Sequence, residues 1–304
     1  MVAFPTETVY GLGADAASEA AVARVFAIKG RPRAHPLIVH LAAGTELDGW
    51  AHDIPDVARR LAAAAWPGPL TIILARGPKV ALATTGGADT VGLRIPAHPV
   101  AQALLRAFGG GIAAPSANRF GAVSPTTADH VMADLGEDVD YILDGGRCDV
   151  GVESTIVDLS RGVPVLLRPG GLAREVIEVI TGPLATPDHT APAAPGTLAS
   201  HYAPRARVIA VRPEDVPGAV AAASGRVAVL APAAAFAAWP ALPAIPHALP
   251  DDPAGMAREL YAALRELDAS GVDVVIAALP PSAGLGEAVG DRLLRAAGPR
   301  GPGR

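Results

Sequence analysis

Short apolar runs of strand length alternate with segments of helical period through most of this chain. Strands are predicted where apolar residues follow one another for a few positions, at residues 36–41, 70–74, 91–95, 111–114, 141–143 and 155–159. Helices are predicted where apolar residues recur with helical spacing, at residues 18–29, 53–65, 100–108 and 127–135. Such alternation is typical of the α/β class.

The start of the chain predicts a strand that runs directly into a turn. Residues 1–4 have the character of a strand end, and a turn is expected at residues 6–13. A strand normally has a neighbouring element to pack beside, so we expect an upstream element to be missing. Without that element, the sheet edge beside residues 2–4 would be uncovered.

The second half of the chain predicts a separate small domain. Residues 182–204 are rich in Pro, Ala and Thr and have no period, as in a linker. Strands at 207–211, 226–230 and 272–279 then surround a helix that Asp252 can cap and Gly271 can end. At 304 residues, one large and one smaller domain are expected. The predicted boundaries are 1–182, a linker or lid at 183–206, and a parallel α/β domain at 207–304.

Composition limits the functional classes. Half of the residues are apolar, 18% are charged and the formal net charge is −5. This balance argues against a protein that binds nucleic acid by electrostatic attraction, so any tRNA contact is expected to be weak or indirect. Cys148 is the single cysteine, and no stretch has the length and apolarity of a membrane helix. We therefore expect a soluble, cytoplasmic protein with no membrane partner.

Polar residues gather at the ends of the predicted strands, in short loops bounded by Gly and Pro. These loops are rich in hydroxyls and cations, and they lack an obvious pair of nucleophile and base. This composition suits the binding and orientation of an anionic substrate better than covalent catalysis. No P-loop, dinucleotide fingerprint, nucleophile elbow or zinc-binding His-Glu-x-x-His motif is present in the sequence.

Six short motifs occur in an order that resembles the YrdC-like family of threonylcarbamoyl-AMP synthases. They lie at residues 4–13 (FPTETVYGLG), 29–32 (KGRP), 66–71 (WPGPLT), 92–96 (GLRIP), 114–118 (APSAN) and 153–157 (ESTIV). Residues 195–204 (PGTLASHYAP) and 284–292 (GLGEAVGDR) resemble the longer, two-domain branch of that family. The resemblance implies a twisted open mixed sheet with helices, followed by a smaller Rossmann-like domain.

The resemblance also implies two sets of binding residues around one basic cavity. L-Threonine would be held by Thr8, His40, Arg94, Ser116 and Ser154. ATP would face Lys29, Arg31, His35, Thr90, Asn118, Ser124, Arg168 and Tyr202. The linker that carries Tyr202 would close over the cavity as a lid and exclude water.

The implied reaction joins L-threonine, bicarbonate and ATP into threonylcarbamoyl-AMP, pyrophosphate and water, the first step of a threonylcarbamoyl modification of tRNA adenosine. No covalent nucleophile is expected. Mg²⁺ would arrive on the triphosphate, since the sequence has no obvious carboxylate cluster for a metal. Transfer to tRNA would require a separate transferase machinery.

Other interpretations stay open on the residues alone. The cavity could recognise a nucleotide or an RNA end without catalysis, or the chain could be a carbamoyl-transfer subunit of metal-centre maturation. Asp89 could pair with Arg94 and make that arginine structural, and Glu153 has the character of a solvated charge. Thr6 and Thr8 could be local backbone caps. His35 stands where the family usually has asparagine.

Overall fold

The computed structural model describes residues 1–299. The chain divides into two compact units. The first unit holds residues 1–120 and 124–197, and the second holds residues 121–123 and those from 198 onward. The division after Thr197 falls inside the segment that the sequence predicts to be a linker. None of the helices within residues 1–299 is long and apolar enough to cross a membrane.

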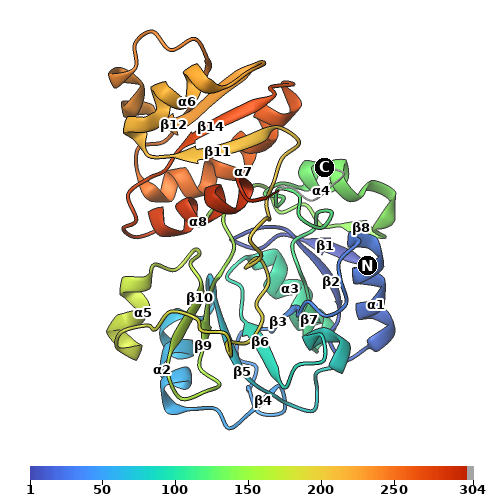
Figure 1. The fold of residues 1–304 in the computed structure, drawn as a ribbon. Coiled ribbons are helices and arrows are strands. Elements are labelled where there is room, and N and C mark those ends of the chain that lie inside the picture. The colour runs from blue at the N-terminus through green and yellow to red at the C-terminus, as the bar shows by residue number, and fades with distance from the viewer. Residues whose placement is uncertain (300–304) are drawn as a thin grey trace. The chain divides into compact units, whose positions relative to one another are not determined.

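The first unit is built on one mixed sheet of ten strands (Figure 1). Nine of the strands lie in the order β10-β9-β5-β6-β3-β7-β2-β1-β8, and β4 pairs with β5. The strands are β1 (Val2–Phe4), β2 (Gly11–Asp15), β3 (Ile38–His40), β4 (Ala51–His52), β5 (Leu70–Arg76), β6 (Thr90–Arg94), β7 (Ile112–Ala113), β8 (Tyr141–Ile142), β9 (Thr155–Asp158) and β10 (Val165–Arg168). The predicted α/β class and mixed sheet are confirmed.

Five α-helices belong to the first unit. They are α1 (Glu19–Lys29), α2 (Asp56–Ala65), α3 (Pro99–Phe108), α4 (Ala128–Leu135) and α5 (Arg174–Thr181). The Ser18 hydroxyl accepts a hydrogen bond from Ala21 N at 3.2 Å, so the predicted cap of α1 is confirmed. Helix α1 ends at Gly30, whose φ of 62° lies in the left-handed region.

The region before α1 differs from the prediction in two ways. The turn predicted at residues 6–13 ends early, because Gly11–Asp15 form a strand that pairs with both β1 and β7. Strand β1 lies between β2 and β8, so the expectation of an uncovered sheet edge at residues 2–4 is wrong. Strands β8 and β10 lie at the two ends of the nine-strand order.

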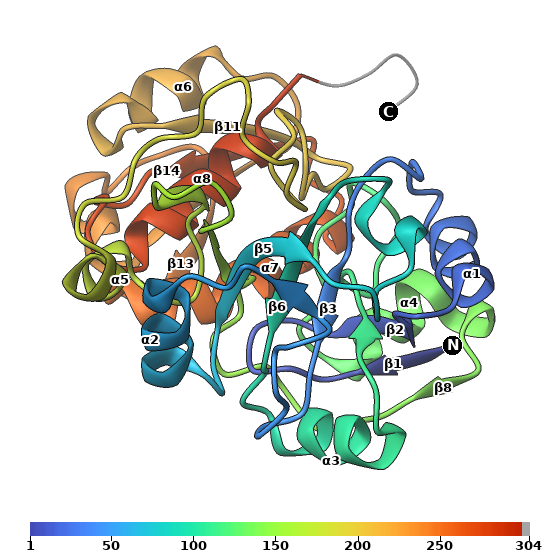
Figure 2. The same cartoon turned by 90° about the horizontal axis from the view of Figure 1, so that it is seen from below.

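The two faces of the first sheet are packed differently. Along β5, β6 and β3, the residues Leu70, Ile72, Val91, Leu93 and Val39 join the main core. Helices α1, α2, α4 and α5, labelled in Figure 2, also contribute residues to this core. The alternate residues point to the other face, because successive side chains of a strand alternate. That second face carries α3 over one part and the linker residues Ala185, Ala191 and Ala194 over another.

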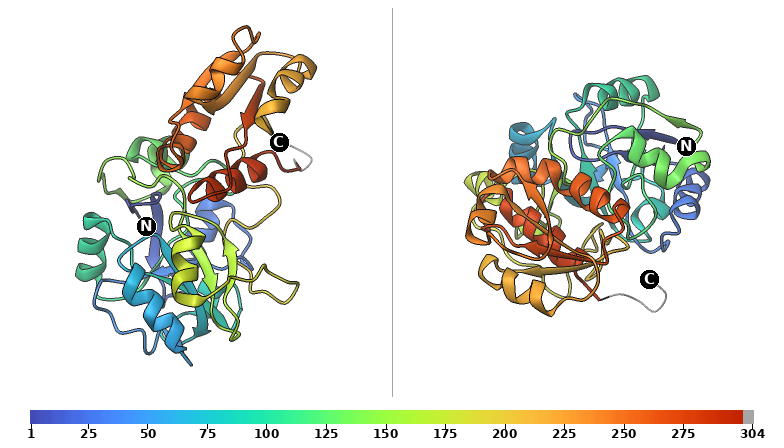
Figure 3. Two further views of the ribbon diagram at one scale, coloured as in Figure 1. Left: turned by 90° about the vertical axis from the view of Figure 1, so that its left-hand side faces the viewer. Right: turned by 90° about the horizontal axis from the view of Figure 1, so that it is seen from above.

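The second unit is a four-stranded parallel sheet with the order β11-β14-β12-β13. Its strands are β11 (Arg207–Val211), β12 (Val227–Pro232), β13 (Ile245–Leu249) and β14 (Val274–Ala278), and its α-helices are α6 (Val216–Ala222), α7 (Pro253–Ala269) and α8 (Gly286–Ala296). Helix α6 packs on one face through Val216 and Val220. Helices α7 and α8, orange to red in Figure 3, contact each other. Asp252 caps α7 as predicted, accepting from Gly255 N at 2.7 Å.

Candidate active site

Three of the predicted substrate-binding residues, Arg94, His40 and Arg168, lie on strands of the first sheet. Arg94 of β6 and His40 of β3 are paired in the sheet. Each follows a residue of the main core, Leu93 or Val39, so its side chain points to the opposite face. Thr71 lies between the core residues Leu70 and Ile72 of β5. Arg168 pairs with Ile156, whose side chain also lies on the second face. In the strand order, Thr71, Arg94 and His40 therefore lie on the neighbouring strands β5, β6 and β3, and β9 separates β5 from Arg168 on β10.

Arg94 is buried and forms an ion pair with Glu7. Its Nη2 lies 2.8 Å from Glu7 Oε1, and both side chains are less than a tenth exposed. Arg94 Nε donates to Gly68 O at 3.4 Å, and Glu7 Oε2 accepts from Ala97 N at 3.0 Å. The alternative in which Asp89 partners Arg94 is wrong, since Asp89 is exposed and Glu7 takes that place. Glu7 was not among the predicted site residues.

Ser154 is the centre of a second polar cluster. Arg168 donates to Ser154 O through Nε at 3.2 Å and Nη2 at 2.7 Å, and the Ser154 hydroxyl lies 2.7 Å from the Thr71 hydroxyl. Arg168 Nη1 donates to Pro195 O at 2.8 Å, so the same guanidinium also holds the linker. All three side chains are buried.

Lys29 is buried at the C-terminal end of α1 and reaches the loop after β7. Its ammonium donates to Ser116 O at 2.6 Å and to Asn118 O. Burial first, and then the charge of Arg31, hold the pKa of Lys29 well below its ordinary value. A bound anion would offset both effects, so this position suits a phosphate.

Arg31 and His35 lie together in the loop after α1. The Arg31 guanidinium lies 5.7 Å from the Phe120 ring centroid, and the His35 ring meets the same ring edge-on at 5.5 Å. Arg31 Nη2 also donates to Pro36 O at 3.0 Å. Burial, and then the charge of Arg31, lower the pKa of His35. The His35 imidazole therefore lies against an aromatic ring that also contacts Arg31.

Two other predicted residues, Ser124 and Thr8, occupy buried positions in the first unit. The Ser124 hydroxyl donates to Glu153 Oε1 at 2.6 Å. The prediction that Glu153 is solvated is wrong, since its side chain is only 7% exposed. The Thr8 hydroxyl lies 2.9 Å from the Thr6 hydroxyl, which also bonds to Val9 O at 2.6 Å. The Thr6 hydroxyl also accepts hydrogen bonds from Thr8 N and Val9 N, each at 3.2 Å, so it caps the local backbone as the alternative interpretation expected.

Glu7 and Glu153 are buried carboxylates to which the interpretation of the sequence gave no substrate role. Each lies inside a quoted motif, directly beside a predicted threonine ligand, Thr8 or Ser154. Their position next to a predicted threonine ligand was the sequence signal that could have marked both glutamates as candidates.

Tyr202 is placed in the second unit. Its side chain is 1% exposed and packs among residues of α7 and α8. Ser116 and Thr90 are half-buried, in the first unit.

The linker covers part of the second face in this conformation. Ala193 and Pro195 enclose a cavity of about 10 Å³ with Thr71, Thr90 and Gly92. This volume accommodates little more than one water molecule, so a nucleotide bound there requires the segment to move.

No cluster of three or more metal-binding side chains occurs within the described part of the chain. Cys148 is 1% exposed, and burial raises its pKa to about 12.

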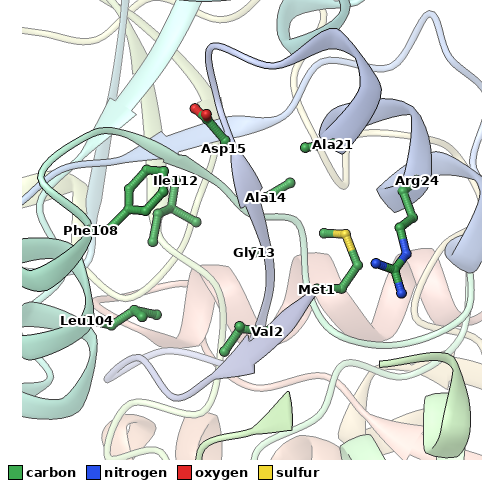
Figure 4. Close-up of a pocket in the computed structure, with 10 residues that line it drawn as sticks. All are labelled: Met1, Val2, Gly13, Ala14, Asp15, Ala21, Arg24, Leu104, Phe108 and Ile112. Atoms are coloured by element: carbon green, nitrogen blue, oxygen red, sulfur yellow. The ribbon is translucent and has the colours of Figure 1, made fainter. Parts of the chain in front are cut away.

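A separate cavity of about 290 Å³ lies among β1, β2, α1 and α3 (Figure 4). Its lining is mostly apolar, with Leu104, Phe108 and Ile112 on one side and Arg24 on the other. None of the predicted substrate-binding residues lines it.

Gly170 allows the loop after β10 to approach the Ser154 cluster. A Cβ at this position would lie 2.3 Å from Glu153 O and 2.4 Å from Ser154 C. We expect Gly170→Ala to displace residues 153–155 and to reduce the free energy of unfolding by about 1–3 kcal/mol or more. Chemical denaturation followed by fluorescence measures this loss. The matched control is Gly218→Ala in α6, where an added Cβ meets nothing within 4 Å. An equal effect of the two substitutions would contradict the expectation.

Comparisons with known families cover almost the whole chain. Residues 1–170 match the family model Sua5_yciO_yrdC, described as "Telomere recombination". Residues 172–298 match the model described as "Threonylcarbamoyl-AMP synthase, C-terminal domain".

Similar proteins come from distant organisms. The threonylcarbamoyl-AMP synthase of Pyrococcus abyssi is 43% identical over 317 residues, which cover 99% of this chain and 91% of that protein. The Bacillus subtilis protein of the same name is 40% identical, with 99% and 90% covered.

Two structures of P. abyssi Sua5 resemble this one, each at 42% identity. A variant with one histidine and one tyrosine replaced by alanine has a TM-score of 0.90, covering 97% of this chain and 88% of that chain. The complex with L-threonine has a TM-score of 0.89, covering 97% and 90%.

Proposed function

The chain belongs to the threonylcarbamoyl-AMP synthase family, and we propose that it catalyses the reaction for which that family is named. L-Threonine, bicarbonate and ATP would be converted to threonylcarbamoyl-AMP, pyrophosphate and water. The enzyme would therefore act as a nucleotidyltransferase. The observation that carries the proposal is the group of buried cations and hydroxyls on the second face of the first sheet. It is supported by the similarity of the fold to P. abyssi Sua5, which was solved in complex with L-threonine.

Threonine would bind between Arg94 and the Ser154 cluster. The carboxylate of the substrate would pair with the Arg94 guanidinium, which Glu7 and Gly68 O orient from the other side. Thr8, Ser116 and Ser154 would direct hydrogen bonds to the remaining polar atoms. Burial, and then the Arg94 charge, lower the pKa of His40 to about 3, so His40 would act as a neutral imidazole at pH 7.

The nucleotide would bind to three other buried cations of the first unit. Lys29, Arg31 and Arg168 suit the triphosphate, since each is buried and a phosphate would offset its charge. His35, Thr90, Asn118, Ser124 and Tyr202 are proposed to contact the rest of ATP. Mg²⁺ carried by ATP would neutralise phosphate charge and keep much of its water shell.

The proposed chemistry needs no nucleophile from the protein. The threonine nitrogen forms a bond to the carbon of bicarbonate and loses a proton as water departs. A carboxylate oxygen of the resulting N-carboxythreonine then bonds to the α-phosphorus, and the bond to pyrophosphate breaks. Both reacting groups are anionic, so the protein contributes by holding them in line between fixed cations. Closure of the linker would keep water from the mixed anhydride. A separate transferase would then move the threonylcarbamoyl group to tRNA.

Pyrophosphate release from ATP tests this function. We expect release only when threonine and bicarbonate are both present, and loss of at least about 90% of the rate when either is omitted. The product is identified by mass spectrometry. Release that needs neither co-substrate would contradict the proposal and indicate a simple ATPase. Salt-sensitive tRNA binding without any release would favour the non-catalytic interpretation.

A further inference from the structure

Lys29 and Lys79 are the two lysines of the chain, and their surroundings differ strongly. Lys79 is exposed and its ammonium lies 5.6 Å from the centroid of the Trp50 ring, whereas Lys29 is only 3% exposed. Lysine is almost never fully buried unless a partner receives its charge. The burial of Lys29 therefore needs a specific reason.

The loop after β7 fixes both the backbone and the side chain of Lys29. Phe120 N donates to Lys29 O at 2.9 Å. The side-chain nitrogen donates to Ser116 O at 2.6 Å and to Asn118 O. All of these residues belong to the first unit. The nitrogen is thus held beside Ser116, which is one of the residues proposed to hold threonine.

The number of acceptors around the Lys29 nitrogen matches a neutral amine. An ammonium has three donors and no lone pair, whereas a neutral amine has two N–H donors and one lone pair. The two backbone carbonyls can receive both donors of the neutral form. No carboxylate within residues 1–299 forms an ion pair with Lys29, so a third donor would lack a protein acceptor. The geometry therefore favours an amine whose lone pair can accept a proton.

The charges near Lys29 act in the same direction on balance. Burial lowers the pKa of Lys29 most, and Arg31 in the loop after α1 lowers it further. Asp134 of α4 raises the pKa by a smaller amount, and Arg119 in the loop after β7 lowers it again. A lysine with a lowered pKa is suited to act as a base near neutral pH. A bound triphosphate would then stabilise the ammonium that forms.

The proposed reaction requires such a base. The threonine ammonium has no lone pair for attack on bicarbonate, and an α-amino group releases its proton only near pH 8. Burial, and then the Arg94 charge, hold the pKa of His40 at about 3, which is too low for a base at pH 7. Arg94 itself stays protonated. The other residues proposed to hold threonine offer hydroxyls.

We propose that Lys29 is the general base of the reaction, and that its amine accepts a proton from the threonine ammonium. This inference rests on the proposed function and adds a catalytic step to the phosphate contact already proposed for Lys29. The proton moves from the threonine nitrogen to the lone pair of Lys29 Nζ, which leaves a neutral substrate amine.

The remaining steps account for every proton. The substrate amine forms its bond to the carbon of bicarbonate, and the departing hydroxide takes the second amine proton and leaves as water. The Lys29 ammonium then pairs with the triphosphate. Its extra proton leaves with pyrophosphate, and this restores the neutral amine for the next turnover.

The ionisation of Lys29 can be measured directly in the full chain. Protein labelled with ¹³C at the lysine Cε atoms gives one NMR signal for each lysine, and Lys79→Arg assigns them by removing one signal. We expect the Lys29 signal to titrate at a lower pH than the Lys79 signal. In the parent protein, kcat/KM for threonine should rise with pH and share its midpoint with the Lys29 signal.

Lys29→Arg separates the base from the phosphate contact, because arginine keeps a cation but cannot accept a proton. We expect kcat/KM for threonine to fall about 100-fold at pH 7, with a change of less than about threefold in the KM of ATP. Part of the lost rate should return above about pH 8, where threonine releases its own proton. Lys79→Arg is the matched control and should follow the parent at every pH.

Two results would overturn the inference: titration of both lysines at the same pH, or pH profiles of Lys29→Arg and the parent that run parallel. In the second case Lys29 would only bind phosphate. If Lys29→Arg does not fold, Lys29→Met is measured for the same recovery at high pH, and the NMR titration needs neither variant. A parent that releases no pyrophosphate would refute the proposed function and the base together. An active parent with either overturning result would refute the base alone.

Discussion

Arg94→Gln is expected to reduce pyrophosphate release by about 100-fold or more, with a large rise in the threonine concentration required. The guanidinium is buried on β6. Among the residues proposed to hold threonine, Arg94 is the one that can form a bidentate pair with a carboxylate, since Arg168 is proposed for the triphosphate. Threonine titrations in the presence of saturating ATP and bicarbonate measure the effect. A KM for threonine close to that of the parent would contradict the assignment.

The same substitution should also destabilise the protein, because it leaves Glu7 buried without its ion-pair partner. Loss of one member of a buried pair typically costs about 3–5 kcal/mol. The double variant Glu7→Gln and Arg94→Gln removes both charges and should recover most of this stability. It should remain inactive. This comparison separates loss of binding from loss of folding, since the double variant should regain stability while activity stays lost in both variants.

The first unit is expected to lose stability steeply as the pH falls below about 6.5. In the folded protein, burial first and then the Arg94 charge hold the pKa of His40 at about 3. In the unfolded chain the pKa is about 6.5, so between these values only the unfolded state binds the proton. The free energy of unfolding then falls by roughly 1.4 kcal/mol per pH unit, or about 4 kcal/mol by pH 3.5.

His40→Gln isolates this contribution. Urea denaturation of both proteins at several pH values between 4 and 7 should show a flatter dependence for the variant. Asp140 should contribute equally in both proteins, since its hydrogen bonds with Arg24 and the N-terminal ammonium, which lower its pKa to about 2, lie outside the substituted site. Parallel pH profiles would show that His40 does not titrate as proposed.

Local signals explain which elements could be predicted from the sequence. Helices α1 and α7 carry their own caps, Ser18 and Asp252, and both begin beside those residues. Strand β2 has no such signal, because Gly11 and Gly13 are poor strand formers and its pairing with β1 and β7 comes from distant parts of the chain. Helix α8 was missed for a similar reason. It begins at Gly286 within a glycine-rich motif, and burial of residues such as Leu293 stabilises it.

The partners of the site residues were harder to predict than the residues themselves. Motif order identified Arg94 as a candidate, yet the nearest acid in the sequence, Asp89, is not its partner. Glu7 reaches Arg94 because the turn after β1 returns to the sheet, and sequence distance does not reveal that approach. Glu153 was expected in solvent because isolated charges usually are, but the chain buries it beside Ser124. The roles of the substrate-binding residues stay predictions until variants are measured.

The buried Cys148 thiol can report transient opening of the first unit. A thiol with a pKa of about 12 is almost entirely protonated at pH 8, and the native packing covers its sulfur. Alkylating reagents will therefore modify it mainly in molecules whose first unit has transiently opened. Because the chain has one cysteine, the second unit contributes no signal to that reaction. The rate of Cys148 alkylation therefore measures transient opening of the first unit in the native protein, without an engineered probe.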